Sequence, residues 1–323
     1  MLQSMVYLFL LIGFVLLIKG ADYFVDGSAN IAKLLKVSPL LVGLTIVAFG
    51  TGAPEATISI IAAIEGSTEL TVGNVVGSNI INTALVVGVT AFIFPLKVES
   101  ATIRKEIPFA FLASLAFLVL ISDQFLSYDS ENMMTQSDGI ILLLFFSIFL
   151  YYVIEVARND RDTFTEENSP SKQIPTWWRS ILIIVGGLGA IIFGGYLVVE
   201  NSTKIAYTFG MSETLVGLTI VAIGSSLPEL VISVTAALKK QSEIALGNIV
   251  GSSIFNILVV LGISSTIFPL VVNNKIFFDA FVMLILVVIL YIFSRTQREV
   301  GKVEGLVLAI IYLAYFVFII IRN

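Results

Sequence analysis

Hydrophobic residues run along the chain in long stretches with few charges, separated by short polar segments. An α-helix needs roughly 20 apolar residues to cross a bilayer, and each stretch is long enough. The pattern predicts about ten spans, at 5–31, 39–64, 70–94, 104–122, 138–157, 178–206, 212–238, 243–268, 276–294 and 303–321. We therefore expect an all-α polytopic membrane protein with ten transmembrane helices.

Composition supports the membrane assignment. Of the 323 residues, 57% are hydrophobic and 13% are charged, and the mean hydropathy is +1.00. A soluble domain has about 25% charged residues, so this chain lacks the charge to cover a water-exposed surface. The N-terminal stretch has no basic segment before its apolar run and no convincing cleavage site, so we interpret it as a first span and not as a signal peptide.

The residue types also limit the chemistry. The chain has no Cys and no His, which excludes thiol and imidazole catalysis, disulfides and His-ligated metals. There is no midplane Asp pair or Ser–Lys arrangement for an intramembrane enzyme, so we expect no enzyme and no cofactor. Any site must use oxygen ligands, which suit Ca²⁺ and Na⁺. The net charge of −5 and the lack of a basic tail give no indication of nucleic acid.

The distribution of Lys and Arg predicts the orientation, because cytoplasmic loops carry an excess of both. With the N-terminus outside, only Lys204, Lys275 and Arg322 lie outside, and Lys19 is ambiguous within the first span. The acidic 122–137 loop also falls outside. We therefore expect a multi-pass protein of the cell membrane with both termini outside. The inside loops then hold fourteen basic residues: Lys33, Lys36, Lys97, Arg104, Lys105, Arg158, Arg161, Lys172, Arg179, Lys239, Lys240, Arg295, Arg298 and Lys302.

The chain contains an internal repeat. A shift of 174 residues aligns 38–96 with 212–270 without a gap, and 30 of the 59 positions are identical. Each half has five predicted spans, an odd number, so the second copy enters the membrane upside down. Inverted repeats with a site at their interface are typical of secondary transporters. We predict repeats at 1–157 and 177–323, joined by a cytoplasmic connector at 158–176.

Two glutamates lie in the middle of predicted spans. Glu55 is in the second and Glu229 in the seventh, and neither span has a Lys or Arg near its Glu. A carboxylate at the bilayer centre costs at least about 2.5–3.5 kcal/mol on insertion scales, so a functional role is favoured strongly over a structural one.

Each glutamate follows a proline, Pro54 or Pro228. Proline removes an amide donor and clashes with the carbonyl four residues earlier, so we predict that the second and seventh helices are broken there. Irregular backbone at membrane depth is tolerated where it lines a site. The hydroxyls of Thr51, Ser225 and Ser226 lie in the same breaks, and together these groups form an oxygen cage for a cation.

The third and eighth spans supply further polar groups. Ser78 and Asn82 are four residues apart and share a helix face, as do Ser252 and Asn256. Asn82 and Asn256 occupy the same position in the two halves, which favours a role in the site. For Asn74 and Asn248, a role in the site and ordinary interhelical hydrogen bonding are equally compatible with the sequence. The glycines of these spans, Gly73, Gly77, Gly247 and Gly251, predict close helix packing.

The paired motifs GTGAPE and GSSLPE, with GNVVGSNIIN and GNIVGSSIFN, resemble the two α-repeats of the Ca²⁺/cation antiporter superfamily. Over essentially its whole length, the chain is similar to the prokaryotic sodium/calcium exchangers of that superfamily. The α-1 region is 38–96 and the α-2 region 212–270.

The resemblance implies four cation positions between the second, third, seventh and eighth helices, with the long first and sixth helices sliding to switch access. It implies that Glu55 and Glu229 hold Ca²⁺ and share Na⁺, and that Ala48 and Ala222 offer backbone carbonyls. The other implied ligands are Thr51, Ser225, Ser226, Ser78, Ser252, Asn82 and Asn256.

The chain departs from the family pattern at two positions. Gly52 stands where the family often has Ser, and Asn256 where some members have Asp. The site therefore has two carboxylates, which neutralise one Ca²⁺, whereas three Na⁺ would leave one net positive charge. The Na⁺:Ca²⁺ ratio cannot be carried over from the family.

The leading hypothesis is a secondary active antiporter that uses the Na⁺ gradient to extrude Ca²⁺ by alternating access. A proton/calcium antiporter of the same superfamily is the nearest alternative; those proteins usually carry an acidic residue or His in the helix that contains the Gly-Asn pair, and this chain has none there. A cation channel is a third possibility, although its filter would normally need an oligomeric ring. Here one chain holds a complete site, so a monomer in the lipid bilayer suffices.

Overall fold

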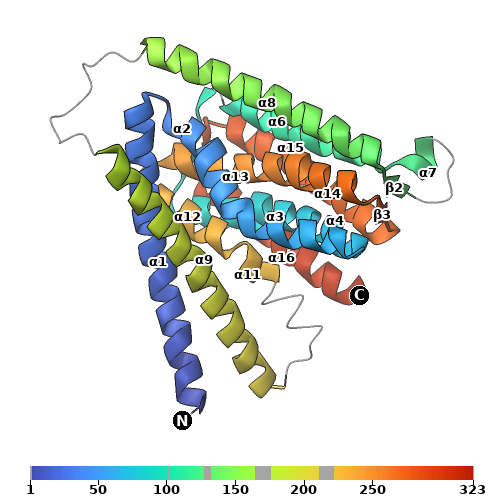
Figure 1. Ribbon diagram of the computed structural model, residues 1–323, viewed down its shortest axis with the longest axis horizontal. Coiled ribbons are helices and arrows are strands. Elements are labelled where there is room, and N and C mark those ends of the chain that lie inside the picture. Colours follow the sequence, from blue (N-terminus) through green and yellow to red (C-terminus); the bar gives the residue numbers. More distant parts are fainter. Residues whose placement is uncertain (1, 101, 127–131, 164–175, 211–221, 323) are drawn as a thin grey trace.

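The computed structural model describes residues 2–100, 102–126, 132–163, 176–210 and 222–322. The described chain is almost entirely helical (Figure 1). This confirms the prediction of an all-α polytopic membrane protein. Part of the predicted connector at 158–176 and the start of the seventh span, 212–221, lie outside the described residues.

The helices follow the predicted spans closely. Eight of those described are long and apolar enough to cross a membrane; the fourth span contains the shorter α6, and the seventh is described only from residue 222. The first half contains α1 (Leu2–Leu35), α2 (Pro39–Val42), η1 (Gly43–Val47), α3 (Ala48–Ile64), α4 (Thr68–Ile80), η2 (Ile81–Val86), α5 (Val87–Ile93), η3 (Thr102–Glu106), α6 (Ile107–Leu120), α7 (Asp123–Leu126) and α8 (Gln136–Thr163). The second contains α9 (Trp177–Thr208), α11 (Ala222–Ser225), α12 (Leu227–Leu238), α13 (Ser242–Phe255), η6 (Asn256–Leu261), α14 (Gly262–Ile267), α15 (Asn274–Arg295) and α16 (Lys302–Arg322).

The predicted break in the second helix is wrong. The helix runs from Pro39 to Ile64 with Pro54 inside α3. Its irregularity is the π-helical turn η1, at Gly43–Val47. A proline costs a helix one amide donor, here the one that would reach the Gly50 carbonyl, and membrane helices absorb such a gap through neighbouring groups and local π adjustments.

The seventh helix is broken, as predicted. α11 ends at Ser225, Ser226 forms a turn, and α12 begins at Leu227 with Pro228 in its first turn. Proline is well suited to that position because the first amides of a helix have no intrahelical acceptor. The matching Pro-Glu motifs of the two halves therefore have different backbones.

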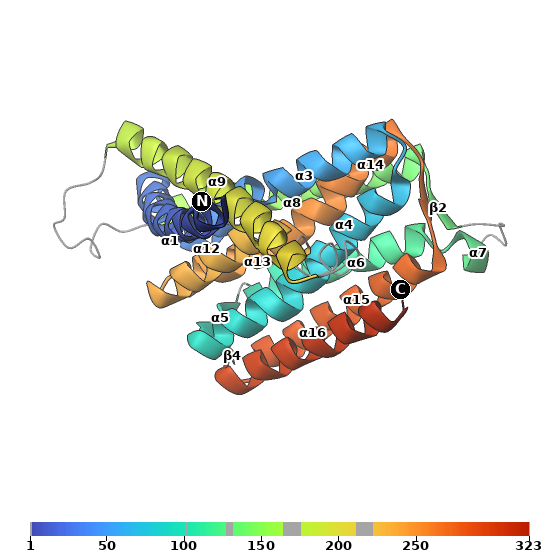
Figure 2. The same ribbon diagram turned by 90° about the horizontal axis from the view of Figure 1, so that it is seen from below.

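Helices α1 and α9 lie side by side and antiparallel, crossing the rest of the bundle (Figures 1 and 2). Glycines form their contact. A methyl group added at Gly20 would lie 2.8 Å from the Gly187 carbonyl oxygen, and one at Gly194 would lie 2.8 Å from the Gly13 carbonyl oxygen. Small residues let helix backbones approach this closely. The glycines also match across the repeat, Gly13 with Gly187 and Gly20 with Gly194.

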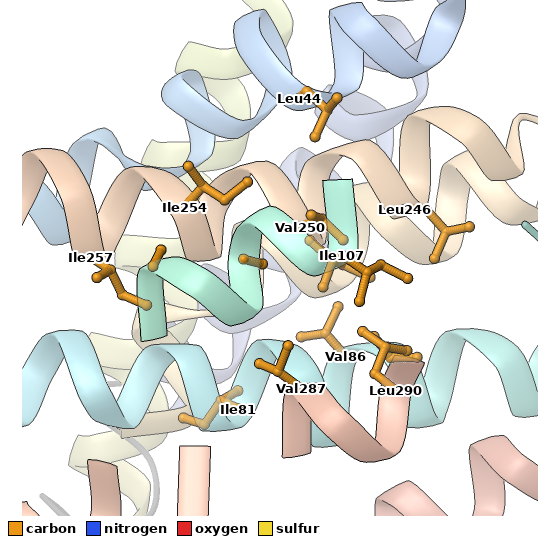
Figure 3. Packing of buried hydrophobic residues seen from close by; sticks show 14 of the residues in the cluster. Leu44, Ile81, Val86, Ile107, Leu246, Val250, Ile254, Ile257, Val287 and Leu290 are labelled. Atoms are coloured by element: carbon orange, nitrogen blue, oxygen red, sulfur yellow. The ribbon is translucent and has the colours of Figure 1, made fainter. Parts of the chain in front are cut away.

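Helix α13 is the centre of the core and is almost completely enclosed. Its apolar side chains, among them Leu246, Val250 and Ile254, pack with residues from η1, α6 and η2 (Figure 3). Gly247 and Gly251 face the backbone of α2 and η1, so the predicted close packing holds for this pair. A methyl group added at Gly73 or Gly77 would have no described atom within 4 Å, and the segment that matches α2 and η1 is outside the described residues.

The shared IFPL segment ends a helix in each half. Phe94 and Phe268 both leave the helix in an extended conformation, because the residue before a proline is pushed out of the helical region. Two short ladders follow: β1 (Leu96–Lys97) pairs with β4 (Glu299–Val300), and β2 (Asn132–Met134) pairs with β3 (Leu270–Val272). The two ladders lie at opposite ends of the bundle (Figure 2).

Candidate cation-binding site

The predicted site residues come together from neighbouring helical elements of both halves. α3 supplies Ala48, Thr51 and Glu55, and α12 supplies Glu229. Four further members, Ser78, Asn82, Ser252 and Asn256, lie in α4, η2, α13 and η6 respectively. Both Asn residues lie at the start of a π-helical segment, a local form that is frequent at functional sites. The hydrophobic pattern of the chain does not indicate these π segments.

Contacts across the site connect one repeat with the other. The Ser226 hydroxyl is 3.4 Å from Glu55 Oε1, and Asn256 Nδ2 donates to Ser78 Oγ at 3.3 Å. Thr51 Oγ1 lies 3.4 Å from Ser252 Oγ. In each pair one residue belongs to the first half and the other to the second, so the site occupies the interface between the repeats.

The site is closed to solvent and rich in unsatisfied oxygen atoms. Glu55 is 1% exposed, and Glu229 and Asn256 are 0% exposed. No described residue donates a hydrogen bond to Glu55 Oε2, to either carboxylate oxygen of Glu229, or to the Oδ1 atoms of Asn82 and Asn256. Burying an unpaired carboxylate is costly unless a cation or proton compensates. No described Lys or Arg pairs with either glutamate.

The donor set fits a hard cation. Carboxylate, amide, hydroxyl and carbonyl oxygens are the ligands of Ca²⁺. Among the described residues no three Asp, Glu, His or Cys side chains gather to hold a metal ion. Beyond the two carboxylates, the ligands therefore have to be neutral groups. The candidate site therefore carries less negative charge than a cage built from carboxylates alone.

Two predicted members, Ala222 and Ser225, lie in α11. Ser225 is half-buried at the end of α11, and Ala222 begins α11. Gly52 faces the second repeat: a methyl group there would lie 3.1 Å from the Phe255 ring and 3.6 Å from Asn256 Oδ1. A serine at this position would meet the aromatic ring.

Four further polar residues surround the site and were not among the predicted ligands. They are Ser59, Asn74, Ser233 and Asn248, which form matching hydrogen bonds in the two halves. The repeat itself carried a signal, because Ser59 matches Ser233 and Asn74 matches Asn248 at the same offset of 174 residues.

Comparison with known proteins identifies the family. The family described as "Sodium/calcium exchanger protein" matches residues 5–155 and 179–321. The chain belongs to this family. It is thus a cation/Ca²⁺ antiporter and a multi-pass membrane protein, and its family consists of transporters and not enzymes.

Individual relatives agree with the family assignment. The chain is 39% identical to the putative antiporter CaxA of Alkalimonas amylolytica, over 95% of this chain and 96% of that protein. It is 34% identical to the sodium/calcium exchanger MaX1 of Methanosarcina acetivorans, over 96% and 97% of the two chains. A solved structure of the sodium-calcium exchanger NCX_Mj superposes with a TM-score of 0.81 at 30% identity, covering 97% of this chain and 98% of that one.

Proposed function

We propose that the protein exchanges Na⁺ for Ca²⁺ by alternating access and expels Ca²⁺ from the cell at the expense of the Na⁺ gradient. The observation that carries the proposal is the closed cage in which two buried carboxylates, with no partner cation from the described residues, face neutral oxygen donors from both repeats. Two negative charges balance one Ca²⁺. Because Na⁺ accepts the same ligands, the two ions compete for one cage and exchange follows.

The two-repeat arrangement supports alternating access. The site lies between the halves, and matched segments of the repeat, β1 and β3, lie at opposite ends of the bundle (Figure 2). This is the placement expected for two copies of opposite orientation. We therefore propose ten spans in two inverted repeats, at 1–157 and 177–323, in the cell membrane with both termini outside.

Sodium is the proposed coupling ion because the helices that carry Asn82 and Asn256 present no further ionisable group to the cage. The stretches GNVVGSNIIN and GNIVGSSIFN contain only neutral residues. We assign the ligands as proposed from the sequence, with Glu55 and Glu229 central. The other proposed ligands are Ala48, Thr51, Ser78, Asn82, Ala222, Ser225, Ser226, Ser252 and Asn256.

A transport assay tests this function. Liposomes containing the purified protein are loaded with Na⁺ and diluted into Na⁺-free buffer with ⁴⁵Ca²⁺, beside vesicles loaded with K⁺ and vesicles with a proton gradient. We expect uptake only with the outward Na⁺ gradient. Uptake driven by a proton gradient without Na⁺ would show that H⁺ and not Na⁺ is the coupling ion. Single-channel currents far above transporter turnover would indicate a channel.

The carboxylate pair is tested in the same assay. Glu55→Gln and Glu229→Gln should each lower Ca²⁺ affinity roughly 100-fold or more, the scale expected when one member of a buried charge arrangement is removed. Glu69→Gln is the matched control, because that carboxylate is outside the cage and bonds to Asn273. Intact Ca²⁺ transport by either cage variant would disprove the assignment.

A further inference from the structure

Each repeat contains an Asn whose amide group ties the third or eighth helix to the glutamate-bearing helix. In the first half, Asn74 Nδ2 donates to Ser59 Oγ at 2.9 Å and to the Glu55 carbonyl at 3.4 Å. In the second, Asn248 Nδ2 donates to Ser233 Oγ at 3.1 Å and to the Glu229 carbonyl at 3.5 Å. The same bonds at the same spacing in both halves indicate a built feature.

These bonds fix which way the Asn248 amide faces. A backbone carbonyl can only accept a hydrogen bond, so the nitrogen of Asn248 has to face Glu229 and Ser233. Its oxygen then points in the opposite direction, where Thr51 Oγ1 lies 3.0 Å away. An amide oxygen can also only accept. The Thr51 hydroxyl, a predicted cation ligand from the other repeat, therefore donates a hydrogen bond to Asn248 Oδ1.

The direction of the Thr51 O–H bond decides whether the lone pairs of this hydroxyl can face a cation. A hydroxyl has one hydrogen and two acceptor lone pairs. With the hydrogen held by Asn248, the lone pairs are free for the cage. Two other acceptors near the hydroxyl, the Ala48 carbonyl at 3.3 Å and Ser252 Oγ at 3.4 Å, are farther away. Those two oxygens are themselves proposed ligands and serve the site best when they are not engaged by Thr51. The Glu229 carboxylate also lies near Thr51, but neither of its oxygens has a hydrogen-bond partner among the described residues.

We propose that Asn248 is a positioning residue for cation binding: it accepts the hydrogen bond of Thr51, so that the lone pairs of this hydroxyl face the cage. Asn248 does not touch the cation. It acts across the repeat interface, and Ser233 holds it in the required orientation. This inference rests on the proposed function of the cage, and it can be tested separately from transport.

The test measures equilibrium ⁴⁵Ca²⁺ binding to the purified full-length protein in detergent. Asn248→Ala and Thr51→Ala should each weaken Ca²⁺ binding about tenfold, the scale of one lost charge-assisted hydrogen bond or ligand. The double variant should bind no more weakly than the worse single variant, because both changes act on binding through the same Thr51 hydroxyl. In a Thr51→Ser background, which keeps the hydroxyl, Asn248→Ala should again cost about tenfold.

Two further variants separate positioning from general packing. Ser233→Ala removes one of the acceptors that orient the Asn248 amide. It should weaken Ca²⁺ binding by a smaller factor than Asn248→Ala does, and only in proteins that have a hydroxyl at residue 51. Ser253→Ala is the matched control, because this buried hydroxyl on the same helix bonds only to the Ile249 carbonyl among the described residues, and it should leave binding unchanged.

The outcomes are distinguishable. Equal weakening by Asn248→Ala with and without a hydroxyl at residue 51 would overturn the proposal, as would a loss of thermal stability with unchanged Ca²⁺ affinity. If Asn248→Ala does not fold, the Ser233→Ala comparison in the two backgrounds decides. Absence of Na⁺-driven uptake by the unaltered protein would refute the proposed function. The Ca²⁺ affinities of the single and double variants would still test the role of Asn248.

Discussion

At the residue scale, the neutral amide of Asn256 leaves the proposed cage with two carboxylates, Glu55 and Glu229. Its amide nitrogen bonds to Ser78 Oγ at 3.3 Å and its oxygen has no donor among the described residues. A carboxylate here would be the third in one closed site. Like charges in a buried site disfavour full ionisation, so protons would then compete with the transported cations.

We expect Asn256→Asp to make Ca²⁺ binding more sensitive to pH than it is in the unaltered protein. As the pH falls, protonation of the crowded carboxylates should reduce apparent Ca²⁺ affinity, by up to about tenfold per pH unit where one proton competes with one ion. Equilibrium ⁴⁵Ca²⁺ binding between about pH 6 and about pH 9 measures this dependence. Parallel pH profiles for the two proteins would contradict the argument.

The sequence predicts Glu55 and Glu229 as the centre of the candidate site because two signals coincide there: each is an isolated carboxylate within an apolar span, and they match across the repeat. The supporting shell was harder to predict. Asn248 has the same residue type and burial as an Asn that only links two helices. Asn248 is distinguished by its three partners, which are Thr51 Oγ1, Ser233 Oγ and the Glu229 carbonyl. Their positions follow only from the folded backbone.

At the scale of the elements, the second helix shows the limit of local rules. Pro54 and Pro228 stand in matching motifs, yet only the second of them begins a new helix. A proline removes one hydrogen bond, and whether the helix then breaks depends on the groups packed around it. The span boundaries were predictable because they follow from apolar length; the π segments were not, because a one-residue widening of the helix leaves the hydrophobic pattern almost unchanged.

The glycine contact between α1 and α9 leads to a prediction about neighbouring residues. Gly187 is buried, and a methyl group on it would lie 2.8 Å from the Gly20 carbonyl oxygen and 2.9 Å from the Phe24 amide nitrogen. Since both neighbours are backbone atoms, Gly187→Ala must separate the two helices. We expect at least about 1–3 kcal/mol of destabilisation, the usual scale of overpacking, and slower Ca²⁺ exchange.

Gly186 gives a matched control on the same helix. It is exposed, and no described atom lies within 4 Å of the added methyl group. Gly186→Ala should therefore keep or slightly raise stability, because Ala favours a helix by about 1 kcal/mol over Gly. Thermal unfolding in detergent and liposome transport compare the two variants. Equal effects of the two substitutions would rule out close α1–α9 packing as the cause.

At the scale of the whole molecule, α1 is tied to the second repeat. Lys239, in the turn after α12, pairs with Asp26 at 2.8 Å and with Asp22 at 3.0 Å. Burial alone would lower the pKa of the Lys239 ammonium, but hydrogen bonds to Asp26 and Asp22 outweigh it and the pKa is raised. The lysine thus stays charged at and above neutral pH. We call the ion pairs of Lys239 with Asp22 and Asp26 the Lys239 clasp, and the charge of its lysine does not change in the physiological pH range.

The repeat register identifies the matching positions in the other half. The offset of 174 sets Glu65 against Lys239 and Glu200 against Asp26. The two turns share a backbone form, because Gly66 and Lys240 have φ values of 77° and 60°. In the first half the turn carries an acid, Glu65. The long helix of the second half has an acid, Glu200, at the position that matches Asp26, and a base, Lys204, one helical turn further along, where it pairs with Glu200 at 2.5 Å.

The base one turn beyond Glu200 leads to the last prediction, because it is the group on α9 that could pair with the acidic Glu65 turn. If two inverted repeats interchange conformations during transport, the Glu65 turn approaches α9 in the opposite access state as the Lys239 turn approaches α1 here. We expect a Glu65–Lys204 pair to form in that state while the Lys239–Asp26 pair separates. Each clasp would then hold one access state, and the two could not exist together.

Because the protein has no Cys, paired cysteines can test this directly. A short bifunctional thiol reagent should link Lys239→Cys to Asp26→Cys in one variant and Glu65→Cys to Lys204→Cys in another, and either link should stop Ca²⁺ exchange in liposomes. A variant with all four substitutions should form one link or the other in each molecule, because each link holds a different access state. The pair Lys239→Cys and Lys204→Cys serves as the control and should not react. Molecules that carry both links at once would show that the two clasps coexist, and the alternation between them would have to be abandoned.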